Sequence, residues 1–121
     1  MKFYVCPVCG NVIYMMNGDV SRVKCCGKEM ALLVPNTVDA SHEKHVPLCN
    51  VSQNKIEVEV GEVRHPMESD HYIMWIAVVK DKNVEIVHFN PGDEPKWTFD
   101  YTEGSIVYAY CNKHGLWKKE I

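Results

Sequence analysis

Nine of the twelve cysteine and histidine residues in this 121-residue chain fall into two separate groups with different chemistry. The first group contains only sulfur and lies near the N-terminus: Cys6, Cys9, Cys25 and Cys26. The second contains four imidazoles and one thiol, spread over a longer segment: His45, His65, His71, Cys111 and His114. Four thiolates suit one tetrahedral metal ion, whereas five donors exceed what a closed tetrahedral zinc site accepts. The second set therefore predicts a redox iron site, and the fold must bring each set to one point.

The composition describes a globular protein of one domain, or of a small module joined to a modest domain. Hydrophobic residues make up 46% of the chain, and no apolar run reaches the length of a membrane span. The formal net charge of −3 argues against a nucleic-acid partner, which usually binds a basic surface. The first residues lack the regions of a signal peptide, so we expect a cytoplasmic protein without a membrane partner.

The cysteine spacing favours metal binding over disulfide bonds. Cys6 and Cys9 form a Cys-x2-Cys pair, and after fifteen intervening residues Cys25 and Cys26 are adjacent. Adjacent cysteines strain badly as a direct disulfide, whereas both can turn toward one ion. Four thiolates accept either zinc or a single iron, and the motif alone does not separate the two metals. Zinc ribbons are the commoner module of this size, but they normally end in a second Cys-x2-Cys pair.

The chain is expected to form two modules, 1–37 and 38–121, joined at a breaker-rich hinge, 35–37. The first module is too short to build a core and needs its metal to fold. Its expected hairpin has strands at 11–16 and 20–24 around a turn at 17–19. The second module alternates polar and apolar residues, and no segment has helical periodicity. Its expected strands are 55–60, 72–79, 84–89, 97–101 and 106–110. This pattern predicts an all-β fold with an antiparallel sandwich.

Each residue of the second donor set is a weak signal by itself, because most loop histidines are solvated or hydrogen-bonded. His65 and His71 flank a short loop that can bring both imidazoles to one point. Cys111 and His114 follow an expected strand within one turn. The occurrence of these motifs together with His45 in one small β domain is what indicates a shared site.

Four stretches of the second module closely resemble the superoxide reductases: Glu-Lys-His-Val-Pro at 43–47, His-Pro-Met-Glu at 65–68, His-Tyr-Ile-Met-Trp-Ile at 71–76 and Tyr-Cys-Asn-Lys-His-Gly-Leu-Trp at 110–117. With the four-cysteine module in front, nearly the whole chain resembles the desulfoferrodoxins, the two-iron form of that family. The resemblance implies a desulforedoxin-like metal-knot module followed by an immunoglobulin-like antiparallel β-sandwich, with two iron ions per chain. It implies that one iron takes four equatorial nitrogens, from His45, His65, His71 and His114, and an axial sulfur from Cys111. The other iron is held by Cys6, Cys9, Cys25 and Cys26.

The resemblance also implies a reaction, the one-electron reduction of superoxide to hydrogen peroxide without release of oxygen, in an organism that avoids oxygen. It gives Lys44 the role of attracting the anion and hydrogen-bonding it. It gives Glu43 the open position of the oxidised iron, which Glu43 leaves on reduction. Without the adjacent His45, this charged pair reads as an ordinary exposed one. A rubredoxin-like electron donor and a homodimer joined through the N-terminal modules complete the expectation.

Two other readings of the chain stay open from sequence. One is an electron carrier that uses only the all-cysteine iron, and the other is a zinc protein in which both sites hold the fold. Three residues fall outside both donor sets: we expect His42 to be a loop histidine, His88 to be structural and Cys49 to be a small buried hydrophobe.

Overall fold

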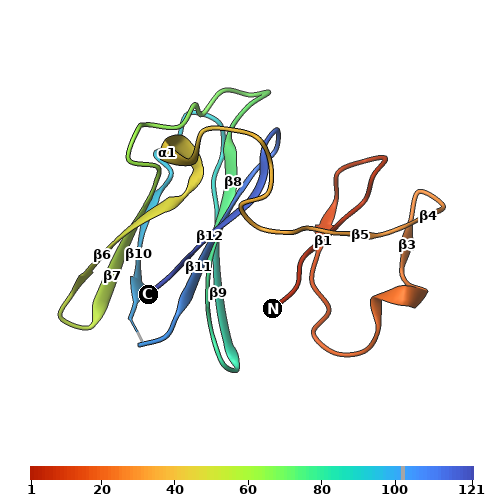
Figure 1. Cartoon of the computed structure of the whole chain (residues 1–121), viewed down its shortest axis with the longest axis horizontal. Coiled ribbons are helices and arrows are strands. Elements are labelled where there is room, and N and C mark those ends of the chain that lie inside the picture. Colours follow the sequence, from red (N-terminus) through yellow and green to blue (C-terminus); the bar gives the residue numbers. More distant parts are fainter. Residues whose placement is uncertain (102) are drawn as a thin grey trace. The chain divides into compact units, whose positions relative to one another are not determined.

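The computed structural model describes residues 1–101 and 103–121. Contacts divide the chain into two compact units, Met1–Val34 and Pro35–Ile121, and Figure 1 shows the elements of each. The module boundary after residue 37, which the hinge residues indicate, stays a prediction. No helix in the described part of the chain has the length and apolar character needed to cross a membrane.

The N-terminal unit contains short strands and little core. Strand β1 (Tyr4–Val5) lies between β2 (Val12–Ile13) and β5 (Ala31–Leu32), and it is antiparallel to both. A second, separate hairpin pairs β3 (Lys24–Cys25) with β4 (Lys28–Glu29). With strands of two residues each, the unit has few ladder hydrogen bonds, so its cysteine cluster must supply much of its order.

The hairpin expected between 11–16 and 20–24 is wrong. Val20–Arg22 forms a 3₁₀ turn, which begins where the Asp19 carboxylate accepts a hydrogen bond from the Ser21 N–H at 2.9 Å. The chain then reverses at Cys26 and Gly27, with φ of 53° and 71°. Positive φ at two successive residues is the geometry of the tightest hairpin turns, so Lys24 pairs with Glu29 instead of with the earlier strand.

The second unit is an antiparallel β-sandwich, as the alternating sequence predicts. One sheet has the strand order β10-β7-β6, and the other has the order β12-β11-β8-β9. The bounds are β6 Pro47–Ser52, β7 Lys55–Val60, β8 Ile73–Lys80, β9 Asn83–His88, β10 Lys96–Asp100, β11 Ile106–Cys111 and β12 Gly115–Glu120. Strands β6 and β12 are absent from the sequence-based expectation, and the other five lie within two residues of their expected bounds.

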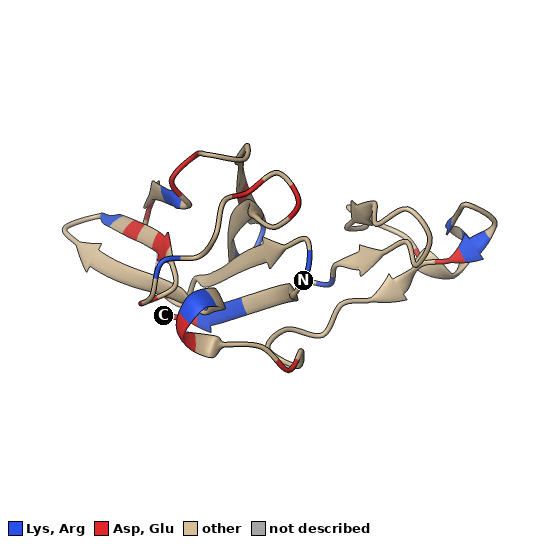
Figure 2. Ribbon diagram, turned by 90° about the horizontal axis from the view of Figure 1, so that it is seen from above, with Lys and Arg blue, Asp and Glu red and all other residues tan. Residues whose placement is uncertain are grey.

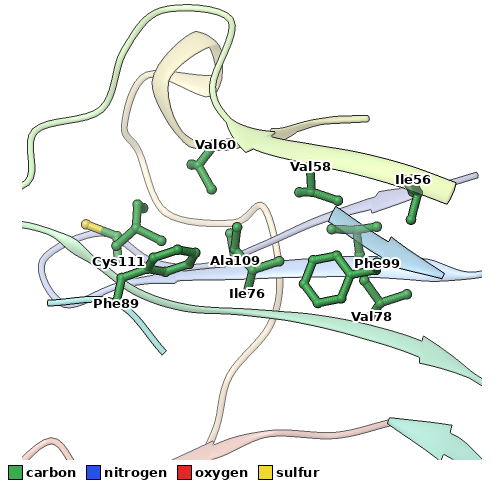
Figure 3. Packing of buried hydrophobic residues seen from close by; sticks show 11 residues of the cluster. Ile56, Val58, Val60, Ile76, Val78, Phe89, Phe99, Ala109 and Cys111 are labelled. Carbon is green, nitrogen blue, oxygen red and sulfur yellow. The ribbon is translucent and has the colours of Figure 1, made fainter. Parts of the chain in front are cut away.

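The core of this unit lies between the two sheets. Figure 3 shows Ile56, Val58 and Val60 of β7 pointing toward Ile76 and Ala109 of the other sheet. Lys55–Val60 alternates exposed and buried residues along its whole length, so the glutamates of β7 face solvent. Cys111 lies at one end of the same buried cluster, which means that the core extends to the second donor set.

One turn of α-helix, α1 (His42–His45), precedes β6, whereas no helix was expected. The turn is closed by its own hydrogen bond, from Val46 N–H to the His42 carbonyl at 2.9 Å, and it is attached to the β7–β8 loop by a hydrogen bond from Val63 N–H to the Glu43 carbonyl at 3.0 Å. A single turn is too short to leave a periodic signal in sequence. Figure 2 shows that α1 carries charges of both signs and that lysines lie on the β3–β4 hairpin.

Two candidate metal centres

The five donors of the second set come from separate segments and converge. His45 ends α1, His65 and His71 lie in the loop between β7 and β8, and Cys111 and His114 lie at the end of β11 and in the turn that follows. Their donor atoms all lie within 4.8 Å of one another. His45, His65 and Cys111 are almost fully buried, whereas His71 and His114 are partly exposed.

The four imidazoles form a closed ring of neighbours. Ring centroids are 4.6 Å apart for His45 and His65, 4.9 Å for His65 and His71, 5.0 Å for His71 and His114, and 4.8 Å for His114 and His45. Each imidazole is tilted from the next by 75° to 85°. This arrangement turns the edges of the rings toward a common centre instead of stacking their faces.

Two of the rings are oriented by backbone carbonyls. His45 Nδ1 lies 2.6 Å from the Ser41 carbonyl oxygen, and His65 Nδ1 lies 2.6 Å from the Pro66 carbonyl oxygen. Because a carbonyl accepts, each Nδ1 must carry the hydrogen, and each neutral ring then has a bare Nε2. The two Nε2 atoms nevertheless face each other at 3.0 Å. Two acceptors at this distance repel unless a cation lies beside both, which is the arrangement that ligand histidines commonly show.

The spacing of the nitrogens also indicates a coordination geometry. Ligand nitrogens about 2.1 Å from a common ion lie about 3.0 Å apart at right angles and about 3.4 Å apart at tetrahedral angles. The observed separations are 3.0 Å between the Nε2 atoms of His45 and His65 and 3.1 Å between His45 Nε2 and His114 Nδ1. His71 Nε2 is buried with no hydrogen-bond partner, as expected of a nitrogen that a metal would satisfy. These two separations thus fit a metal that takes neighbouring nitrogens at right angles better than one with tetrahedral angles.

Burial favours the neutral form of three of these imidazoles by lowering the pKa of His45, His65 and His71. Desolvation, followed by the proximity of the other imidazoles, lowers the pKa of His65 to about 4. Desolvation also lowers the pKa of His45 and of His71. A neutral imidazole is the form that binds a metal, so the site is ready for one at neutral pH.

The Cys111 sulfur is buried and receives backbone N–H groups. Desolvation raises the pKa of the Cys111 thiol, and hydrogen bonds from the N–H groups of Lys113 and His114 lower it. N–H donation to a ligand sulfur withdraws electron density and so adjusts how strongly the sulfur donates to a metal.

The two charged residues of α1, Glu43 and Lys44, differ in their relation to the second donor set. The positive charges of Lys44 and Lys113 both lower the pKa of His71, which places both lysines within electrostatic reach of the site. Glu43 does not join the converging donors. It lines a surface pocket together with His42 and Cys49.

The first donor set also converges. The Cys9 and Cys25 sulfurs are 3.6 Å apart, and those of Cys25 and Cys26 are 4.0 Å apart. Sulfurs at about 2.3 Å from a tetrahedral ion lie about 3.8 Å from one another, so the set fits one tetrahedral metal. Its four sulfur atoms come from Cys6, Cys9, Cys25 and Cys26.

The thiols of this knot differ in how easily they ionise. The N–H groups of Cys9 and Val8 each donate to the Cys6 sulfur at 3.4 Å, and the pKa of Cys6 falls to about 6. The neighbouring sulfurs of Cys9 and Cys25 raise the pKa of Cys26 to about 12. The four thiols therefore resist ionising together, and a bound cation removes that resistance.

Several residues that shape the second site carry no clear sequence signal. Ser41 and Pro66 act through backbone carbonyls, which any residue provides. Trp117 stacks on His45, with ring centroids 4.9 Å apart, and its Nε1–H donates to the His114 carbonyl at 3.0 Å. His42 lies outside the donor set and contacts Trp117 edge-on, with ring centroids 5.0 Å apart.

The fold and the two donor sets define a class, an all-β metalloprotein with a four-sulfur knot and a separate four-nitrogen, one-sulfur centre. The desulfoferrodoxin family model matches residues 37–120. A desulfoferrodoxin of Syntrophotalea carbinolica is 43% identical over 121 residues, covering 99% of this chain and 96% of the relative. The superoxide reductase structure from Treponema pallidum matches with a TM-score of 0.76 and 28% identity, covering 98% of this chain and 97% of the other. The one-iron superoxide reductase from Giardia intestinalis matches with a TM-score of 0.58 and 30% identity, covering 65% of this chain and 97% of the other. The chain belongs to the desulfoferrodoxin family.

Proposed function

We propose that this protein is a superoxide reductase with two iron ions, which reduces superoxide to hydrogen peroxide without releasing oxygen. The observation that carries the proposal is the second donor set, in which four imidazoles and one buried thiol converge and His45 Nε2 lies 3.0 Å and 3.1 Å from two neighbouring nitrogens. A closed structural zinc site takes four donors at tetrahedral angles, whereas this set offers five donors and shorter nitrogen separations. Membership of the desulfoferrodoxin family and similarity to superoxide reductase structures support the same activity.

When bound, ferrous iron supplies one electron to superoxide, and two protons complete hydrogen peroxide. The chain's own part is to keep that ion accessible and cationic. Imidazoles add no charge to the ion, and the single thiolate adds one negative charge, so the site attracts an anion. We propose that His45, His65, His71, His114 and Cys111 would together hold this iron.

Lys44 and Lys113 add positive charge on the partly exposed side of the site, where His71 lies. We propose that Lys44 attracts superoxide and hydrogen-bonds it on arrival. We propose that the Glu43 carboxylate would occupy the open position of the bound iron in its oxidised state and leave it on reduction. Glu43 lines a surface pocket, so only its side chain would have to turn toward the site, while its carbonyl keeps the hydrogen bond from Val63 N–H.

The N-terminal knot holds the other iron and is suited to receiving electrons. Cys9 and Cys26 are exposed, and Lys24 and Lys28 flank the adjacent cysteine pair on the β3–β4 hairpin. We propose that a small acidic electron carrier of the rubredoxin kind is the donor.

A homodimer joined through the N-terminal units is our further proposal. Val8 and Met16 have exposed fractions of 62% and 88% in a unit too small to bury them, and a second copy would cover such surface.

All six cysteines are free thiols, which favours a reducing compartment such as the cytoplasm.

The test is metal analysis followed by stopped-flow reaction with superoxide, on anaerobically prepared protein. Two irons per chain and rapid superoxide consumption without oxygen evolution support the proposal. Stoichiometric zinc at both sites would show a structural protein, and iron without reaction would show an electron carrier. Cys111→Ser should abolish reduction, whereas Cys25→Ser should remove only the N-terminal iron. Cys49→Ser is the matched control, because that thiol lies outside both sets. A folded, iron-loaded Cys111→Ser protein that reacts at the parent rate would refute the role of the axial sulfur.

A further inference from the structure

Asn112 connects the segment that carries Cys111 to the segment that carries His71. Its side-chain Nδ2 donates to the Asp70 carbonyl at 2.9 Å, and its Oδ1 accepts from the Tyr72 N–H at 2.9 Å. Its backbone N–H also lies 3.3 Å from the Tyr72 carbonyl oxygen. The residues on both sides of His71 in the chain are therefore held by one residue, which itself follows Cys111 directly.

The connection lies directly after an irregularity in the β8–β11 ladder. The pairing is regular from Ile106 opposite Val79 to Tyr110 opposite Trp75, and then skips one residue of β8, so that Cys111 lies opposite Ile73. The Asn112 amide adds a side-chain donor and a side-chain acceptor where the strands leave this ladder, on the segment that carries His71.

His71 is held in place differently from the buried donors His45 and His65. The rings of His45 and His65 are fixed by hydrogen bonds from Nδ1 to carbonyl oxygens. His71 is partly exposed, and its backbone N–H and carbonyl bond to Glu68 across a two-residue bridge. That bridge closes the loop on itself but does not attach it to the rest of the site. The Asn112 amide makes this attachment.

We propose that Asn112 is a positioning residue that keeps His71 in the ligand set of the second metal site by clamping the backbone on both sides of it. The inference rests on the proposed metal site, although not on the identity of the substrate. An amide is required for the full clamp, since it offers a donor to one carbonyl and an acceptor to one N–H at the same time. A carboxylate at this position would face the Asp70 carbonyl with an oxygen, which repels it.

Asn36 provides a matched control within the same chain. Its side chain makes the same two-way clamp on backbone, with Nδ2 donating to the Lys118 carbonyl at 3.3 Å and Oδ1 accepting from the Lys118 N–H at 2.9 Å. Lys118 follows Trp117, which contacts His45, but it does not itself flank a donor of either site. Since Asn36 has a φ of 61°, its replacement should be glycine, which tolerates that conformation. Asn36→Gly thus removes an equivalent clamp without touching the metal donors.

The experiment uses the full chain loaded with Co(II), which binds such sites and reports coordination number in its ligand-field bands. Asn112→Ala and Asn112→Ser are compared with the parent and with Asn36→Gly by competition against a chelator. We expect both Asn112 variants to bind Co(II) at the second site about 10–100-fold more weakly, as loss of a residue that orients a ligand usually does. Their bands should shift from five-coordinate toward four-coordinate character. The four-cysteine site of the same molecules should keep its affinity, which provides an internal reference.

Two results would overturn the inference. One is parent-like Co(II) affinity and bands in a folded Asn112→Ala or Asn112→Ser protein, with folding checked by urea unfolding. The other is an equal loss of affinity in Asn36→Gly, which would trace the effect to general destabilisation. Failure of the proposed function would be seen separately, as a parent protein that binds metal at both sites but does not consume superoxide.

Discussion

Trp117 offers the sharpest test of how the second site is held together. Its side chain is fully buried, with its indole face against the His45 ring at an interplanar angle of 23° and its Nε1–H on the His114 carbonyl. One residue therefore supports two of the four imidazoles by different interactions. Trp117→Phe removes the hydrogen bond and keeps an aromatic face, whereas Trp117→Leu removes both.

The expected magnitudes follow from those contacts. Trp117→Phe leaves a partly buried carbonyl without its donor, which costs about 1–2 kcal/mol of unfolding free energy. Trp117→Leu also loses aromatic contact and leaves a cavity, and large-to-small changes of this kind cost about 3–5 kcal/mol. For a domain of this size, each kcal/mol lowers the melting temperature by about 4–8 °C. Typical domain stabilities of about 5–15 kcal/mol leave the Phe variant folded.

The assay is urea unfolding of each variant together with the rate at which a chelator removes iron from the second site. We expect the Phe variant to be less stable than the parent but to hold its iron nearly as long, because the stacked ring still orients His45. The Leu variant should lose iron faster, since the His45 ring gains freedom on the side that Trp117 covers. The four-cysteine iron should be retained equally in both. If the Phe and Leu variants release iron at the same rate, stacking on His45 does not orient that ligand.

Three further changes test other parts of the molecule. Lys44→Ala should slow the bimolecular reaction with superoxide and flatten its dependence on salt, and an unchanged salt slope in stopped-flow kinetics would refute steering by this charge. Gly61 has a φ of 83°, and an added Cβ would lie 2.6 Å from the Lys44 carbonyl oxygen. Gly61→Ala should therefore lower the free energy of unfolding in urea by about 2 kcal/mol or more, and parent-like stability would contradict this contact. Burial raises the pKa of the Cys49 thiol to about 11, so at pH 8 its alkylation should be about 100-fold slower than that of a thiol with the ordinary pKa of 9.0. The alkylation should accelerate as the pH rises toward 11, and rapid labelling at pH 8 would refute the burial of this thiol.

The sandwich strands were predictable where burial follows a period of two. Lys55–Val60 alternates strictly, and its expected bounds agree with the structure. β6 begins with a proline and is mostly exposed, so it has no apolar alternation to detect. β12 ends in Lys118, Lys119 and Glu120, so it too lacks an alternation of apolar and polar residues along its length. Both missed strands lie at sheet edges, whereas the edge strands β9 and β10 carry enough apolar residues in alternation to be predicted.

The N-terminal unit was the hardest part to predict because it has almost no core. Asn17 and Gly18 have the composition of a hairpin turn, but the chain reverses at Cys26 and Gly27 instead. Where few apolar residues fix the register, the need to bring four sulfurs together outweighs local turn preference. The donor residues could be identified from their chemistry. Asn112 and Trp117 lie in the stretch 110–117 that resembles the superoxide reductases, but only the structure shows what their side chains contact.

The second site has a fixed half and an accessible half, and this division bears on how an anion reaches it. His45 and His65 are 2% and 1% exposed and have their rings bonded to carbonyls, so they form the fixed half. His71 and His114 are partly exposed, and both Lys44 and Lys113 act electrostatically on His71. Positive charge therefore gathers on the side where solvent already reaches the imidazoles. A contact that covered the His71 ring would hold this side of the site but would also block an approaching anion. The Asn112 amide holds only the backbone beside His71, so it leaves the ring open to solvent. His71 can then stay in place in the donor set without being enclosed.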